Sequence, residues 1–139
     1  LGDLGKYVLL ILVLTGVMLA LHEGIHGFFF WLFTRSRPRF AVRLAYAYAA
    51  APEWYLPRNQ YLVTALSPLV GITLFCVLLI LVVPPAWFWA VGFVMIFNAS
   101  GAVGDLWVAG WLLTMPSDCY ACDCGDAVTL YRRGGAPRP

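Results

Sequence analysis

Two histidines and a glutamate lie within one pentapeptide, His22-Glu23-Gly24-Ile25-His26, and the chain contains no other histidine. On an α-helix His22 and His26 lie about 40° apart around the axis and about 6 Å apart along it, so both rings can bind one metal ion. Glu23 lies on the flank of that face, where its carboxylate can reach a water molecule without binding the metal. The spacing predicts an HExxH zinc site with Glu23 as the general base.

Packing is the alternative role for these histidines, because imidazoles also hydrogen-bond across bundles of membrane helices. The metal hypothesis is favoured because His22, His26 and the adjacent Glu23 fit one spacing together and lie in an apolar run. Ionisable side chains are costly in such a run and are rarely kept there without a use.

A third ligand is expected, because a catalytic zinc ion takes three protein ligands and keeps one position open. Asp105 is the remaining carboxylate within the apolar segments. An unpaired Asp at the centre of a membrane helix costs about 2.5 to 3.5 kcal/mol. His26 and Asp105 each lie roughly 12 to 15 Å inside the same end of their predicted helices. We therefore expect Asp105 to complete the site, with a helix–helix hydrogen bond or a proton relay as its alternative roles.

Asn98 lies on the same predicted helical face as Asp105, and so does Gly101. The Asn98 side chain is a candidate for binding the substrate backbone or a developing oxyanion. Hydrogen bonding between helices explains an asparagine there equally well.

The composition indicates that these residues lie in a membrane protein. Of the whole chain 62% is hydrophobic and 12% is charged, and the mean hydropathy is +0.80. Three apolar segments, about 7–33, 61–83 and 86–113, are long enough to cross a bilayer. The first exceeds the apolar region of a signal peptide, so we expect it to be retained. The sequence predicts an all-α membrane protein with a three-helix core over 1–116 and a tail over 117–139.

Basic residues lie almost entirely on one side of these segments. Lys6 is on the other side, and the net charge of +2 does not require nucleic-acid binding. The positive-inside rule then places the loop over 34–60 and the tail in the cytoplasm and the N-terminus outside. The basic residues on the cytoplasmic side are Arg35, Arg37, Arg39, Arg43, Arg58, Arg132, Arg133 and Arg138.

The four cysteines carry a weaker signal. Cys76 lies in the second apolar segment and is expected in the core. Cys119, Cys122 and Cys124 form a CxxCxC cluster that can contribute to a second metal site, although no further histidine or cysteine pair completes four ligands. We expect the end of the tail, 134–139, to be disordered.

The chain resembles the site-2-protease-like intramembrane metalloproteases, and most closely a family of small membrane proteins described as putative zincin peptidases. The resemblance covers HEGIH in the first helix, Leu66-Ser67-Pro68-Leu69 in the second, Asn98 to Asp105 in the third and Asp123-Cys124-Gly125-Asp126 in the tail. It implies one Zn²⁺ ion on His22, His26 and Asp105, with Glu23 as the catalytic base. The third helix departs from the site-2 protease pattern, because no proline lies between Asn98 and Asp105 and Leu106 replaces a glycine.

A short strand or β-hairpin is expected between Arg39 and Tyr48, where β-favouring residues partly alternate before an alanine run and Pro52. In site-2 proteases a comparable element pairs with an extended substrate, which is β-augmentation. An interfacial loop whose arginines contact lipid headgroups is the alternative.

These features together predict a zinc-dependent intramembrane endopeptidase that hydrolyses membrane proteins near the cytoplasmic face. The alternative is a membrane metal carrier or sensor that uses the same ligands without hydrolysis. Glu23 discriminates between the two, because hydrolysis needs a general base at this position and binding does not.

Overall fold

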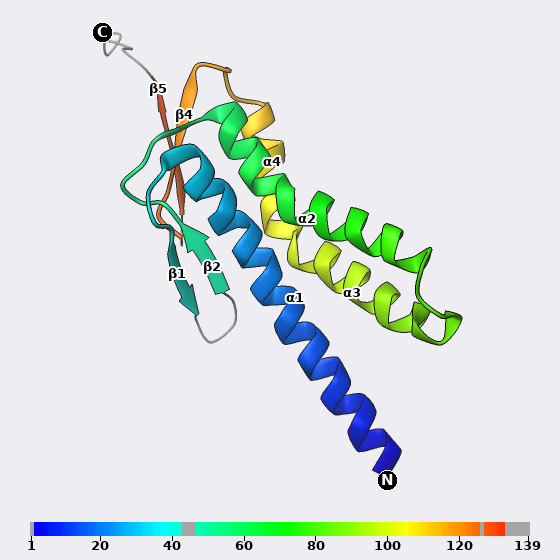
Figure 1. The fold of residues 1–139 in the computed structure, drawn as a ribbon. Helices are drawn as coiled ribbons and strands as arrows, with labels where there is room; N and C mark the ends of the chain where they lie inside the picture. The colour runs from blue at the N-terminus through cyan, green and yellow to red at the C-terminus, as the bar shows by residue number, and fades with distance from the viewer. Residues whose placement is uncertain (1, 43–46, 126, 133–139) are drawn as a thin grey trace, which may run out of the picture.

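The computed structural model describes residues 2–42, 47–125 and 127–132, and it shows apolar helices with short strands gathered at one end (Figure 1). The N-terminal part of the first helix extends beyond the others (Figure 1). The helices are α1 (Gly2–Thr34), α2 (Arg58–Ile80), α3 (Phe88–Gly101) and α4 (Val103–Leu113), and a 3-10 turn over Pro85–Trp87 precedes α3.

The predicted third span is a bent pair of helices. α1 and α2 are each long and apolar enough to cross a membrane, whereas α3 and α4 meet at an angle of 46°. The break falls at Ala102, which is completely buried and follows Ser100 and Gly101. Ser100 Oγ donates to the Ile96 carbonyl at 2.9 Å, and such side-chain bonds and Ser/Gly pairs bend helices. Among the described residues, two helices could therefore cross a membrane, and a third crossing is possible if the bent pair counts as one span.

Strands β1 (Arg39–Val42) and β2 (Ala47–Ala50) form an antiparallel hairpin in which Arg39 pairs with Ala50. This confirms the predicted β structure in the loop, with β2 continuing into the alanine run. The rest of the predicted segment, 43–46, lies outside the described residues. The Phe40 ring fills the space that a side chain on Gly27 would occupy, since a Cβ there would lie 2.3 Å from the ring. The hairpin is thereby held against α1.

The tail folds back onto the loop. Strands β3 (Leu56–Pro57), β4 (Cys119–Asp123) and β5 (Val128–Arg132) form an antiparallel sheet in that order, with Leu56 opposite Ala121. Gly125 has a φ of +88°, a left-handed conformation that glycine adopts readily between β4 and β5. Loop and tail therefore lie together at one end of the helices. The predicted disorder of 134–139 concerns residues outside those described.

The main core lies where the helices meet the sheet. It joins residues from α1, α2, α4 and the strands, namely Phe30, Ala49, Ala51, Leu56, Tyr61, Ala65, Leu112 and Ala121. A second cluster in the helices contains Cys76, which is buried as predicted. Elsewhere on α1 and α2 many large apolar side chains face outward, as expected where lipid replaces water. These surfaces mark a membrane protein.

Candidate metal centre

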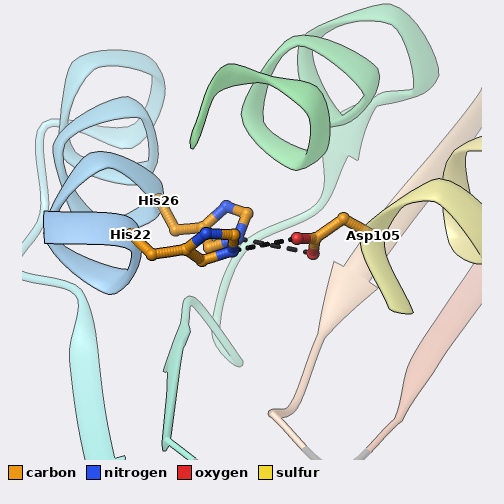
Figure 2. Close-up of side chains that lie close together, drawn as sticks. All are labelled: His22, His26 and Asp105. Carbon is orange, nitrogen blue, oxygen red and sulfur yellow. Dashed lines mark hydrogen bonds and ion pairs between the residues drawn. The ribbon is translucent and has the colours of Figure 1, made fainter. Parts of the chain in front are cut away.

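The three predicted ligands converge from two helices. His22 and His26 come from neighbouring turns of α1, and Asp105 lies in the first turn of α4 (Figure 2). His22 Nε2 lies 3.1 Å from Asp105 Oδ2, and His26 Nε2 lies 3.4 Å from Asp105 Oδ1. One ligand atom from each residue can be chosen so that all three lie within 4.8 Å of one another. Residues separated widely in the sequence therefore form one candidate metal centre.

Asn98 orients the first histidine. Its Oδ1 lies 3.0 Å from His22 Nδ1, and its Nδ2 donates to the Leu69 carbonyl at 3.4 Å. Since an amide oxygen can only accept, His22 Nδ1 carries a proton, and the Nε2 atom faces Asp105. The Asn98 side chain is completely buried. The structure thus places it behind His22 and between helices, instead of on the cavity wall where a substrate would meet it.

A backbone carbonyl orients the second histidine, and a proline makes that carbonyl available. His26 Nδ1 donates to the Thr64 carbonyl at 3.0 Å. In a regular helix this oxygen would accept the N–H of residue 68, but residue 68 is a proline and has no N–H. Ser67 Oγ also donates to the same oxygen, at 2.8 Å. Pro68 therefore leaves a hydrogen-bond acceptor in α2 free to hold His26.

Replacing Pro68 by Ala should change helix stability and zinc affinity in opposite directions. Alanine restores the N–H that competes with His26 for the Thr64 oxygen, while it removes the cost of proline in a helix interior. We expect zinc affinity to fall about tenfold, as for other partners of metal-bound histidines. The melting temperature of the zinc-free protein should rise. Calorimetry and competition with a chelating dye measure both effects, and Pro84→Ala, at the turn after α2, is the control. Unchanged zinc affinity would contradict this role.

Charge balance at the centre favours a bound cation. With both Nδ1 atoms donating, the Nε2 atoms of His22 and His26 face the Asp105 carboxylate, and a metal ion between them would replace the protons that otherwise join these atoms. Two imidazoles and one carboxylate form a typical donor set of catalytic zinc sites, in which a fourth position stays open. The residues present therefore fit zinc.

A cavity of about 240 Å³ lies beside the three ligands. Glu23 lines it without belonging to the ligand group, and the backbone N–H of Ala49 in β2 interacts with the Glu23 carboxylate. Gly101 and Gly104 form part of the opposite wall, where an added Cβ would meet no atom within 4 Å. The cavity thus has space for a water molecule and a peptide group next to the ligands.

Two further polar residues, Tyr61 and Asp123, line the cavity, although the sequence pattern assigns neither of them a role in the site. Tyr61 from α2 donates its hydroxyl to Asp123 Oδ2 at 2.5 Å, and the Gly125 N–H donates to Asp123 Oδ1 at 2.7 Å. Burial raises the pKa of the Asp123 carboxyl, while these two hydrogen bonds act to lower it. A turn signal at Gly125 between two short β-favouring stretches would have predicted the hairpin, but no local signal predicts the contact with Tyr61.

The cysteines of the tail do not gather into a metal-holding group among the described residues. Side chains alternate along a strand, so Cys119 and Cys122 lie on opposite faces of β4. Cys122 Sγ lies 3.4 Å from the Pro52 carbonyl, and Cys124 is exposed.

Fold and site together define a membrane protein with a candidate metal centre of the metallopeptidase type. Residues 15–120 match the model of a family described as "Putative zincin peptidase", and the chain belongs to this family. This membership supports a metallopeptidase and implies zinc as its metal. Comparisons with curated proteins and with solved structures give no match.

Proposed function

We propose that the protein is a zinc-dependent intramembrane endopeptidase of the site-2-protease type, which cleaves membrane proteins near the cytoplasmic face. One observation carries the proposal: Glu23 shares a cavity with His22, His26 and Asp105 but is not part of the ligand group. A carboxylate in this place is available for proton transfer, which is the role of the glutamate in an HExxH site.

The residues of the cavity divide the reaction between them. Zinc held by His22, His26 and Asp105 would polarise the scissile carbonyl and make a water molecule more acidic. Glu23 takes a proton from the attacking water and passes it to the leaving amine. The peptide must be extended when it enters, because a helical substrate hides its carbonyls in hydrogen bonds.

The hairpin next to the site supports entry of an extended peptide. Ala47 and Ala49 of β2 line the cavity with small side chains. Within the described part of the chain, β2 pairs only with β1, so its second edge carries no strand. A substrate segment added to this edge would pass the metal centre, which is β-augmentation.

The cytoplasmic location rests on charge. The pairing of β3 with β4 holds the arginine-rich loop and the tail at the same end of the helices, next to the cavity. Under the positive-inside rule this end faces the cytoplasm. Fusion of a reporter enzyme to either terminus tests the orientation, and a cytoplasmic N-terminus would contradict it.

Removal and return of the metal test the function directly. Wild-type protein in detergent is stripped with a chelator and assayed on a panel of single-span membrane proteins. We expect cleavage to disappear with the zinc and to return on addition of one equivalent of Zn²⁺, because the open coordination position is needed for attack.

Magnesium added in place of zinc is the control, since it prefers oxygen ligands and octahedral geometry. Stoichiometric zinc without cleavage of any substrate over a broad panel would overturn the peptidase and support a membrane metal carrier or sensor.

A further inference from the structure

Asp123 is a half-buried carboxylate that lines the cavity from the tail. It ends β4, whose alternating side chains place it on the same face as Ala121 of the main core. It lines the cavity together with Glu23 and the three metal-site residues, yet it does not belong to the metal-holding group. No ion pair joins Asp123 to a basic side chain in the described ranges. A half-buried acid beside a candidate metal centre and without a cationic partner is a candidate for binding a ligand.

The partners of Asp123 fix its position and leave acceptor capacity unused. Tyr61, itself buried in the core, donates to one carboxylate oxygen, and the Gly125 N–H donates to the other. An ionised carboxylate has about four acceptor sites, so two donors occupy half of them. The Tyr61 oxygen can accept one more hydrogen bond as well. The oxygens of Asp123 and Tyr61 therefore offer hydrogen-bond acceptors to the cavity.

We propose that Asp123, held in place by Tyr61, binds the substrate peptide by accepting a hydrogen bond from a substrate N–H. The inference rests on the proposed peptidase function. The Asp123 carboxylate complements the N–H donors of a peptide and repels its carbonyls. The scissile carbonyl is thereby directed toward the metal side of the cavity, and the chain direction of the bound peptide is selected. The N–H belongs either to a backbone amide beside the scissile bond or to the amine that leaves.

Asp123→Asn is the informative variant. The Asn oxygen can still accept from the Gly125 N–H, and its amide can donate to the Tyr61 oxygen, so the fold is kept while an acceptor in the cavity becomes a donor. The probe is fluorescein-labelled casein, an unfolded polypeptide, in detergent with zinc-loaded protein. Its binding is measured by anisotropy in an inactive Glu23→Gln background, and its cleavage is measured with Glu23 intact.

We expect Asp123→Asn to lower kcat/KM by about tenfold to a hundredfold at unchanged zinc content, as for loss of a hydrogen bond to a charged group. If the donor is a backbone amide of the substrate, the substitution should raise KM and weaken casein binding by the same factor. If the donor is the amine that leaves, the substitution should lower kcat and leave casein binding unchanged. Tyr61→Phe should act in the same direction with a smaller effect, since the carboxylate remains but is less well fixed.

Asp118→Asn is the matched control, because Asp118 is an exposed acid of the same tail that pairs with Arg132. Unchanged binding and kcat/KM in Asp123→Asn would overturn the inference, and so would a loss of zinc that accounts for the whole decrease. Weakened casein binding without cleavage by the wild type would uphold the Asp123 contact and overturn the peptidase. Cleavage by Asp123→Asn at the wild-type rate would uphold the peptidase and overturn the Asp123 contact.

Discussion

Glu23→Gln should abolish peptide cleavage while zinc binding stays intact. Glutamine keeps the size and hydrogen-bonding reach of the side chain but cannot take a proton from water. General-base catalysis is worth about 10²- to 10⁴-fold, so the rate should fall by at least two orders of magnitude. Zinc content should stay stoichiometric, since Glu23 is not among the three ligands. Cleavage is followed on a co-expressed single-span substrate and zinc by mass spectrometry.

Glu53→Gln is the control for this experiment, because Glu53 is an exposed acid paired with Arg39 outside the cavity. Equal cleavage by the wild type and by Glu23→Gln would contradict the general-base mechanism. Loss of zinc together with cleavage would instead make Glu23 a fourth ligand.

Asp105→Asn should have the largest effect on zinc itself. Substitution of residues that merely orient a ligand lowers metal affinity by 10- to 100-fold, so loss of a charged ligand should exceed about 100-fold. His22 and His26 would then share the ion with a neutral amide, and the anion that balances its charge would be gone. Zinc affinity is measured by competition with a chelating dye, and cleavage at saturating zinc is measured in parallel.

Asp3→Asn serves as the control, since Asp3 pairs with Lys6 on the exposed start of α1. Zinc bound as tightly by Asp105→Asn as by the wild type would show that another acid completes the site. Asp123, in the same cavity, would then be the next residue to replace.

Local spacing was sufficient to predict the histidine pair, because four residues on a helix fix where two rings lie. Depth along two apolar segments was sufficient to select Asp105, and the structure brings it to both histidines. Their role as metal ligands stays a prediction. Both steps succeed because the stretches from His26 and from Asp105 to the ends of α1 and α4 are regular, so position in the sequence converts into position in space.

The rest of the site depends on contacts that no spacing reveals. Pro68 was visible in the sequence, but its effect on the Thr64 carbonyl matters only because His26 packs against that point of α2. The bend at Ala102 follows residues with weak helical preference and contains no proline that would announce it. Asp123 reaches Tyr61 through a sheet that joins the loop to the tail, and such pairing is fixed by the complete fold.

The pairing of β3 with β4 has a consequence for biosynthesis. Leu56 is made long before its partner Ala121, and the two helical segments between them must insert into the bilayer first. Asp105 and Asp123 are likewise made after both histidines. A ribosome-bound chain that has completed only α1 and α2 therefore holds Glu23 and both histidines, but neither Asp105 nor the strands that complete the cavity. The proposed site is therefore assembled only after β4 has been made, and we expect a shorter nascent chain to leave neighbouring membrane proteins uncleaved.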